Sequence, residues 1–380
     1  MEEFIDFKDR LTWEAQLTSI KINGELTDDE KKDISISFQN LKTIFGDDFL
    51  INIFNSRHPL GQKFVNHAAW TRLWIAWMSD SLYNIKEQDN FTSLIKRIKN
   101  PAQYNEGLSV LEIAAKFSTS NLLVDFDPKV IANGKEKMPD LHIISNETNE
   151  DFYIEVSTLE KGENLIRNMK LTENLFMSFA VSFSGILLRD LEDEEFISIK
   201  TEIELNAERA LKENQLITLN IPNIIEIGFA PVFNSTTLKD WSQKKGYRIG
   251  NFILPQENFN PTLRLRRKIE AKQKQLPEGK PNILALKMKD VHSLWVDKSA
   301  LIGLVEEAVN KYDHLFAVII FDQHMGSPQE ELIIQDMNFF LSKQQGNVIV
   351  ENSFVFFNKF SKIKITPFLM NSIFNSLVHN

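Results

Sequence analysis

The stretch KMPDLHIISNETNEDFYIEVST, residues 137–158, contains two short runs in which apolar and polar residues alternate, separated by a polar turn. Alternation with a period of two is typical of β-strands whose two faces meet different environments. If the runs pair as a hairpin centred near Glu147 and Thr148, residues whose numbers sum to 147 + 148 = 295 lie opposite one another, and Asp140 faces Glu155. The sequence therefore predicts antiparallel pairing of residues 140–144 with residues 152–157.

The same alternation separates a core face from a polar face. The core face holds Leu141, Ile143, Phe152, Ile154 and Val156, and the polar face holds Asp140, His142, Tyr153, Glu155 and Ser157. Two carboxylates directly opposite one another, with Cβ atoms about 5 Å apart, destabilise a sheet unless a cation neutralises them. Mg²⁺ is the simplest cation for this place because it prefers carboxylate oxygens and water. A solvated hairpin face, with the register shifted by one residue, is the alternative that the alternation leaves open.

Composition limits the class of protein. The chain has 380 residues, of which 43% are hydrophobic and 25% charged, as in globular proteins. It contains no cysteine, which excludes disulfides, thiolate metal sites and cysteine nucleophiles. The first residues, MEEFIDFKDRL, contain no apolar signal core, and the longest apolar run, residues 175–188, is short for a membrane span. We expect a cytoplasmic protein without a membrane partner.

The distribution of charge is uneven. The formal net charge is −9, but residues 239–290 contain thirteen Lys or Arg and five Asp or Glu, a net +8, so the rest of the chain carries −9 − 8 = −17. A basic segment in an acidic chain indicates either a site for a polyanion or a solvated helix face.

The period of the apolar pattern changes along the chain. Residues 1–100 have helical patterns, including a helix that begins after Thr27 and ends near Gly46, and Asn100-Pro101 breaks this pattern. Strand patterns follow, and later helices alternate with strands, which favours some parallel pairing. EELIIQDMNFFLS, residues 330–342, is predicted to be a helix. The glycines form no phosphate-binding loop of the GxGxxG or GxxxxGK[ST] type.

These motifs resemble the PD-(D/E)xK nuclease superfamily, whose restriction-endonuclease-like core consists of a helix, three strands, a helix and a strand. Pro139-Asp140 matches the PD motif, and Glu155-Val156-Ser157 matches ExK, with serine in place of the usual lysine. LSVLEIAAKF resembles the first core helix, and its Glu112 matches an additional acid often found there. The resemblance covers residues 104–160 best and extends to TLRLRRKIEAKQKQLPEGKPNILALKM as second core helix and fourth strand.

The resemblance implies a metal-dependent site. Glu112, Asp140 and Glu155 would hold Mg²⁺ or Mn²⁺, with Asp140 and Glu155 catalytic. A surface ion pair between Glu112 and Lys116, four residues apart, is the alternative for Glu112. Ser157 cannot supply the positive charge of the missing lysine, which the resemblance associates with positioning or deprotonating the attacking water.

A substitute for this lysine is available on the predicted basic helix. Arg264, Lys268, Lys272 and Gln275 lie within about 40° of one direction at 100° per residue. A lysine that reaches the site from the second core helix is a known variation of the superfamily. Lys272 is the expected catalytic lysine, with Lys268 as the alternative, and Lys268 and Gln275 are expected to bind substrate. Solvated helix charge is the alternative for each of them.

We therefore expect an α/β fold, a mixed sheet flanked by helices, with a restriction-endonuclease-like core. The expected domains are a helical region at 1–100 and a nuclease-like domain at 101–380 with an α+β insertion at about 161–262. The expected function is Mg²⁺-dependent hydrolysis of phosphodiester bonds in nucleic acid, with DNA preferred over RNA. A degenerate member that binds nucleic acid or protein without cleavage is the second reading, and a non-nucleolytic interaction protein is the third. The sequence also leaves homodimerisation open.

Overall fold

The computed structural model describes residues 11–56, 58–118, 122–148, 150–159, 171, 181–255, 261–288, 298–325, 331–335, 338–345, 349–363 and 366–378. Contacts divide the chain into two units. One unit consists of Met1–Leu159 together with Pro261–Asn380, and the other is Glu160–Asn260, a range close to the one expected for the insertion. Each unit is described by itself below. No helix within the described ranges combines the length and apolar composition that a membrane span requires.

The N-terminal region is helical, as the sequence predicts. Its helices are α1 (Trp13–Lys21), α2 (Asp28–Phe45), α3 (Phe49–Asn55), α4 (Pro59–Val65), α5 (Ala69–Ile85) and α6 (Phe91–Lys99). Thr27 begins α2 through a capping box: its N–H donates to the Glu30 carboxylate at 2.8 Å, and the Glu30 N–H donates to the Thr27 hydroxyl at 3.3 Å. The helix ends at Gly46, whose φ of +89° suits a residue without Cβ. Both predicted ends of this helix are confirmed.

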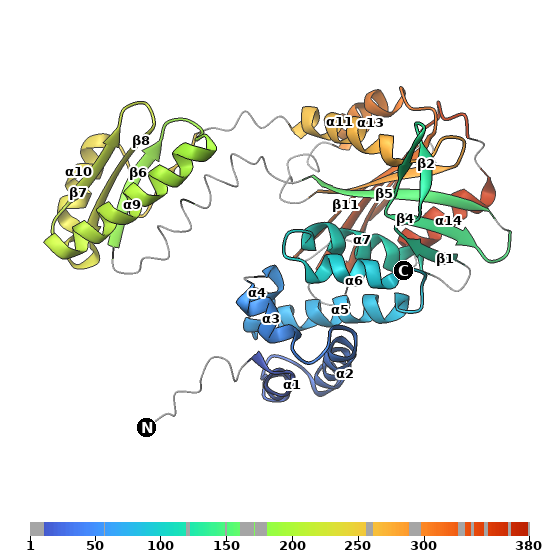
Figure 1. The fold of residues 1–380 in the computed structure, drawn as a ribbon, viewed down its shortest axis with the longest axis horizontal. Coiled ribbons are helices and arrows are strands. Elements are labelled where there is room, and N and C mark those ends of the chain that lie inside the picture. Colours follow the sequence, from blue (N-terminus) through green and yellow to red (C-terminus); the bar gives the residue numbers. More distant parts are fainter. Residues whose placement is uncertain are drawn as a thin grey trace. The chain divides into compact units, whose positions relative to one another are not determined.

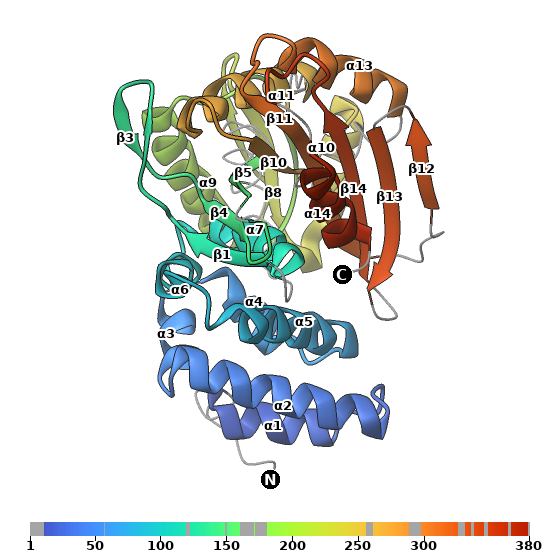
Figure 2. The ribbon, with the colours of Figure 1, turned by 90° about the vertical axis from the view of Figure 1, so that its right-hand side faces the viewer.

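An eight-stranded mixed sheet forms the centre of the first unit (Figure 2). In spatial order its strands are β1 (Leu122–Phe126), β4 (Leu141–Ser145), β5 (Asp151–Leu159), β10 (Asn282–Met288), β11 (Leu315–Met325), β14 (Ile349–Phe357), β13 (Asn338–Gln345) and β12 (Glu331–Gln335). Strands β5, β10 and β11 pair in parallel, and the other neighbours pair antiparallel. The expected parallel pairing late in the chain is confirmed.

Helices cover both faces of this sheet. Helix α7 (Tyr104–Phe117) lies on one side, and α11 (Pro261–Lys272) and α13 (Lys298–Val309) lie on the other (Figure 1). Helix α14 (Pro367–Val378) contributes to the same hydrophobic core as α7 and the N-terminal helices. The fold class is therefore α/β with a mixed sheet flanked by helices, as expected. Along the chain, α7, β1, β4, β5, α11 and β10 occur in this order, with residues 130–137 forming two further short strands between β1 and β4 and the second unit lying between β5 and α11.

The predicted helix at residues 330–342 is wrong. Over the described residues, this segment forms β12 and the first part of β13, which pair antiparallel with Ile333 opposite Phe340. Strand β13 in turn pairs with β14, where Phe340 is opposite Phe354. Short apolar runs do not distinguish a buried helix from a strand, and β-branched and aromatic residues pack well across strands. Tertiary pairing with β14 therefore decides the structure of this segment.

The second unit has its own sheet and hydrophobic core. Its elements are β6 (Val181–Leu187), α9 (Asp193–Glu213), β7 (Ile217–Ile221), β8 (Ile225–Pro231), η2 (Val232–Asn234), α10 (Ser235–Lys245) and β9 (Phe252–Ile253). The strand order is β7-β8-β6-β9, with β8 antiparallel to both β7 and β6. Buried side chains of β6, β8 and α9, among them Phe183, Ile203 and Phe229, form its core. This composition agrees with the α+β character expected for the insertion.

Candidate active site

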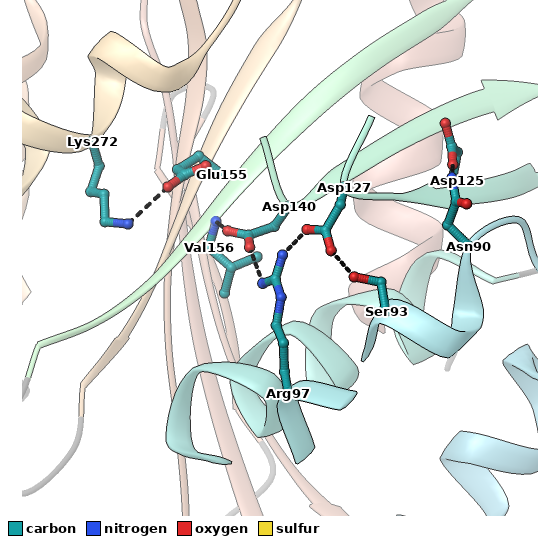
Figure 3. Close-up of polar contacts among 9 residues, drawn as sticks. All are labelled: Asn90, Ser93, Arg97, Asp125, Asp127, Asp140, Glu155, Val156 and Lys272. Atoms are coloured by element: carbon teal, nitrogen blue, oxygen red, sulfur yellow. Dashed lines mark hydrogen bonds and ion pairs between the residues drawn. The ribbon is translucent and has the colours of Figure 1, made fainter. Parts of the chain in front are cut away.

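The hairpin of β4 and β5 forms with the predicted register. Leu141 is opposite Ile154, and Ile143 is opposite Phe152, so the numbers of paired residues sum to 295 as expected. Continuing this register by one residue places Asp140 opposite Glu155. The Val156 N–H donates to Oδ2 of Asp140 at 2.8 Å, which fixes this carboxylate against β5 (Figure 3). Both acids are buried, with 8% of Asp140 and 4% of Glu155 exposed, so the solvated hairpin face is excluded.

Lysine 272 reaches this hairpin from the helix on one face of the sheet. Helix α11 packs against β5, with Leu265 and Ile269 buried. At the last residue of α11, the Lys272 Nζ donates to Oε1 of Glu155 at 2.9 Å (Figure 3). The predicted direction of Lys272 toward the acids is confirmed. Helix α11 thus supplies, through Lys272, the amine that β5 lacks at Ser157.

An arginine that the sequence reasoning missed holds the other acid. The Arg97 guanidinium, from α6, forms ion pairs with Oδ1 of Asp140 at 2.5 Å and with Asp127 (Figure 3). The Ser93 hydroxyl also donates to Asp127. Gly107 of α7 permits this approach, because a Cβ at Gly107 would lie 3.1 Å from Cβ of Arg97 and from the Ile98 side chain. The close contact of α6 and α7 therefore positions the arginine.

The pKa values of Glu155 and Lys272 are both raised, for different reasons. Burial, and then the neighbouring Asp140, raise the pKa of Glu155 to about 8, although Lys272 and Arg97 act in the opposite direction. Burial acts to lower the pKa of Lys272, but the charges of Glu155, Asp140 and Glu106 outweigh it and raise that pKa above its usual value. Lys272 is therefore an ammonium at neutral pH. Glu155 retains its proton to a higher pH than an unperturbed glutamate, because its carboxyl group is buried beside the carboxylate of Asp140.

Among the charges that raise the pKa of Lys272, Glu106 of α7 has the smallest effect. It lies in the first turn of α7, is exposed, and contributes to raising the pKa of Lys272. Its signal in the sequence is weak, because an acid in the first turn of a helix is common and is explained by the helix dipole.

Glutamate 112, expected as the third metal ligand, is not brought to the acid pair. It is buried and paired with Lys287 of β10. Lys287 is opposite Thr158 on β5. Thr158 is three residues from Glu155 on the same strand, so the side chains of Thr158 and Glu155 point to opposite faces of the sheet. Helix α7 lies on the Thr158 face, where Ser109 contacts Thr158 at 3.0 Å. The expectation that Glu112 joins Asp140 and Glu155 as a metal ligand is therefore wrong, because Glu112 lies on the other face of the sheet.

The alternative for Glu112, a surface pair with Lys116, is also not observed. Lys116 is buried and forms its ion pair with Glu351 of β14. Lys343 of β13 is opposite Glu351, and burial and then Lys116 lower the pKa of Lys343 to about 8. These residues form a buried ionic network on the α7 face of the sheet, separate from Asp140 and Glu155.

The two expected substrate-binding residues lie near Lys272 in the chain. Lys268 is half-buried one turn earlier on α11, and Gln275 is half-buried in the short 3-10 helix η3 (Gln273–Gln275). The polar partners described for Asp140 and Glu155 are the Val156 N–H, Arg97 and Lys272. Their expected contact with substrate is not tested by these positions.

The donor set fits a divalent cation of the Mg²⁺ type. Mg²⁺ is commonly held by one or two carboxylates, with waters and substrate phosphates completing its coordination. Asp140 and Glu155 would provide these carboxylates, although no group of three or more Asp, Glu or His suited to a metal occurs in the described ranges.

Comparison with protein-family models, with curated proteins and with solved structures found no match for this chain. The assignment of a function therefore depends on the geometry of the site.

Proposed function

We propose that this protein is a Mg²⁺- or Mn²⁺-dependent nuclease that hydrolyses phosphodiester bonds, with DNA as the expected substrate. The observation that carries the proposal is the contact between Lys272 Nζ and Glu155 Oε1 at 2.9 Å, beside Asp140. Two carboxylates and one amine meet at this place, from the residue before β4, from β5 and from α11. The combination matches the chemistry that phosphodiester hydrolysis requires, namely ligands for a hard cation and a positive charge near the reacting phosphate.

Asp140 and Glu155 are the residues that would hold the ion. A bound Mg²⁺ supplies an acidified water and neutralises the charge that develops on the scissile phosphate. The Val156 N–H and Arg97 hold the Asp140 carboxylate in one orientation, since each of its oxygens accepts from one of them. Glu155 uses Oε1 for Lys272. A fixed pair of acids is what a preorganised site needs.

Lys272 acts as a cation in this proposal rather than as a general base. Its raised pKa keeps the amine protonated at neutral pH, so it cannot accept a proton from water until a neighbouring charge changes. As an ammonium it donates hydrogen bonds, stabilises negative charge on the phosphate and orients the attacking water. Only 27% of its side chain is exposed, which strengthens these interactions relative to bulk water.

Binding without cleavage is the second candidate function. It is favoured by the observation that each acid already has a cationic partner within the chain, Arg97 for Asp140 and Lys272 for Glu155. In this reading the two basic side chains take the place of a metal ion, and the fold serves only to bind nucleic acid or a protein.

Cleavage assays with the full chain separate the two candidates. The purified protein is incubated with supercoiled plasmid, linear duplex DNA and RNA, with Mg²⁺, Mn²⁺ or EDTA. We expect cleavage with either metal and none with EDTA. Asp140→Asn, Glu155→Gln and Lys272→Ala should each reduce the rate by about 100-fold or more, because each removes a charge that stabilises the transition state.

Arg267→Ala is the matched control, since Arg267 is an exposed cation of the same helix that has no role in the proposed site. It should retain the cleavage rate. Ser157→Lys should change the rate little if Lys272 fills the role of the missing lysine. Wild-type protein that binds DNA but does not cut it with any metal would favour the second candidate.

A further inference from the structure

A groove with three lysines lies beside the proposed active site. Its volume is about 400 Å³, and it runs between the hairpin of β2 (Val130–Ala132) and β3 (Lys135–Lys137) and the segment that follows α11. Lys135 and Lys137 line it from the hairpin, and Gln273, Lys274 and Glu278 line it from the other wall, with His314 also present.

The hairpin directs both of its groove lysines to the same face. Ala132 is opposite Lys135, and Val130 is opposite Lys137, so these four side chains share one side of the hairpin. Ala132, Lys135 and Lys137 line the groove, whereas Glu136 belongs to the other side and pairs with Lys129 at 3.2 Å. The hairpin therefore presents positive charge to the groove and keeps its acid away from it.

The turn of this hairpin makes the arrangement rigid. Asn133 and Gly134 connect the strands with φ of +51° and +70°. Positive φ at both central residues defines a type I′ turn, whose twist matches that of paired strands and for which Asn-Gly is a preferred sequence. The positions of Lys135 and Lys137 are thus set by the backbone.

Positive charge exceeds negative charge among the groove residues, which include three lysines and the acid Glu278. In the described ranges, none of Lys135, Lys137 and Lys274 forms an ion pair, and Glu278 is the acid among the groove residues. Lys135 and Lys274 are exposed, and Lys137 is half-buried. Three amines around one groove give it a net positive charge within a chain whose formal charge is −9.

Both walls of the groove continue directly into the site. Lys137 is three residues before Asp140, a span of at most about 10 Å for extended chain. Gln273 follows Lys272, whose amine contacts Glu155. A chain of phosphates whose scissile bond lies at the acids would therefore pass the groove lysines.

We propose that this groove binds the phosphate backbone of duplex DNA beside the cleaved bond, through Lys135, Lys137 and Lys274. This rests on the proposed nuclease function. Lysine contacts to phosphate fix the register of a protein on a duplex without reading its sequence. Each such contact releases a condensed counterion, so it contributes to the salt dependence of binding.

The test is binding of a fluorescent duplex, measured by anisotropy at several salt concentrations, with EDTA present so that metal-dependent cleavage does not interfere. The groove variant carries Lys135→Ala, Lys137→Ala and Lys274→Ala. The control variant carries Lys21→Ala, Lys31→Ala and Lys32→Ala, which removes three lysines of α1 and α2, none of which lines the groove. Circular dichroism checks that both variants are folded.

We expect the slope of log K against log salt to become shallower by about 2.7 in the groove variant, from about 0.9 per phosphate contact. The control variant should keep the wild-type slope. With Mg²⁺, the groove variant should cut duplex DNA more slowly at moderate salt and regain rate at low salt, because the acids and Lys272 are intact.

The outcomes distinguish the groove from the proposed function. Equal slopes for wild type and groove variant, with wild type still cutting DNA, would overturn the groove and leave the nuclease. A slope change without any cleavage by wild type would support the groove and overturn the nuclease. A wild-type protein that neither binds nor cuts duplex DNA would overturn both.

Discussion

Replacing Glu155 by glutamine is expected to change how the stability of the protein depends on pH. Glu155 has a pKa of about 8 in the folded chain, against 4.5 for an unperturbed glutamate. The folded state therefore holds a proton that the unfolded state loses, and wild-type stability falls as pH rises between these two values. Glutamine cannot titrate, so the variant should lose this contribution to the pH dependence.

The size of the effect follows from the shift in pKa. A difference of about 3.5 units corresponds to an upper limit of about 5 kcal/mol, at about 1.4 kcal/mol per unit. The ion pair with Lys272 stabilises the charged form, and the partly exposed lysine admits water, so we expect a loss of about 2–3 kcal/mol in wild type. Below about pH 4.5 the proton on Glu155 contributes fully to the stability of the folded state, and above about pH 8 this contribution is lost.

The assay is chemical unfolding at a series of pH values, followed by circular dichroism for wild type and Glu155→Gln. The chain has two units, so a single two-state free energy of unfolding does not describe it. The quantity compared is therefore the difference in stability between wild type and variant as a function of pH. Glu278→Gln, which removes an exposed acid, is the control. Added Mg²⁺ should stabilise wild type at high pH and the variant much less. Parallel stability curves for wild type and Glu155→Gln across this range would refute the reasoning.

Three further changes have definite expected outcomes. Glu112→Gln leaves the buried Lys287 ammonium without its counter-charge and should lower stability by about 3 kcal/mol, measured by urea unfolding. The affinity for Mn²⁺, measured by calorimetry, should stay at the wild-type value. Loss of Mn²⁺ binding in this variant would show that Glu112 is a metal ligand. Arg97→Ala leaves Asp127 and Asp140 unpaired and should cost about 3 kcal/mol, part of which Mg²⁺ recovers in thermal unfolding because it can take the place of the guanidinium at Asp140; an unchanged melting temperature would contradict this. Gly107→Ala should destabilise by about 1–3 kcal/mol and weaken metal binding, because its Cβ would press on Arg97 and Ile98; a fully stable variant would show that α6 and α7 can separate without consequence.

The hairpin was predictable because its information is local. Period-two alternation fixes both the register and the faces, and a shift by one residue would move the apolar set of Leu141, Ile143 and Phe152 out of the core. The direction of Lys272 was predictable for a related reason: the buried Leu265 and Ile269 define the inner side of α11, and Lys272 adjoins it. The segment at residues 330–342 was not, because only β14 decides between helix and strand there.

The role of α7 illustrates what one sequence cannot decide. Glu106 and Glu112 are six residues apart, so at 100° per residue they point about 120° away from each other. The position of each depends on how α7 rotates on the sheet, and that is set by contacts such as Ser109 with Thr158. Arg97 is 43 residues from Asp140, and its contact depends on the crossing of α6 and α7 at Gly107. Both facts belong to tertiary packing.

The separation of Glu155 and Lys272 in the chain has a consequence for synthesis on the ribosome. The two residues are 117 positions apart, with the second unit between them. At about 5–20 residues per second, Lys272 is polymerised roughly 6–23 s after Glu155. During this interval the nascent chain contains both acids but not the amine that completes the proposed site. The proposed nucleolytic activity would therefore begin only after the second unit and α11 have been made.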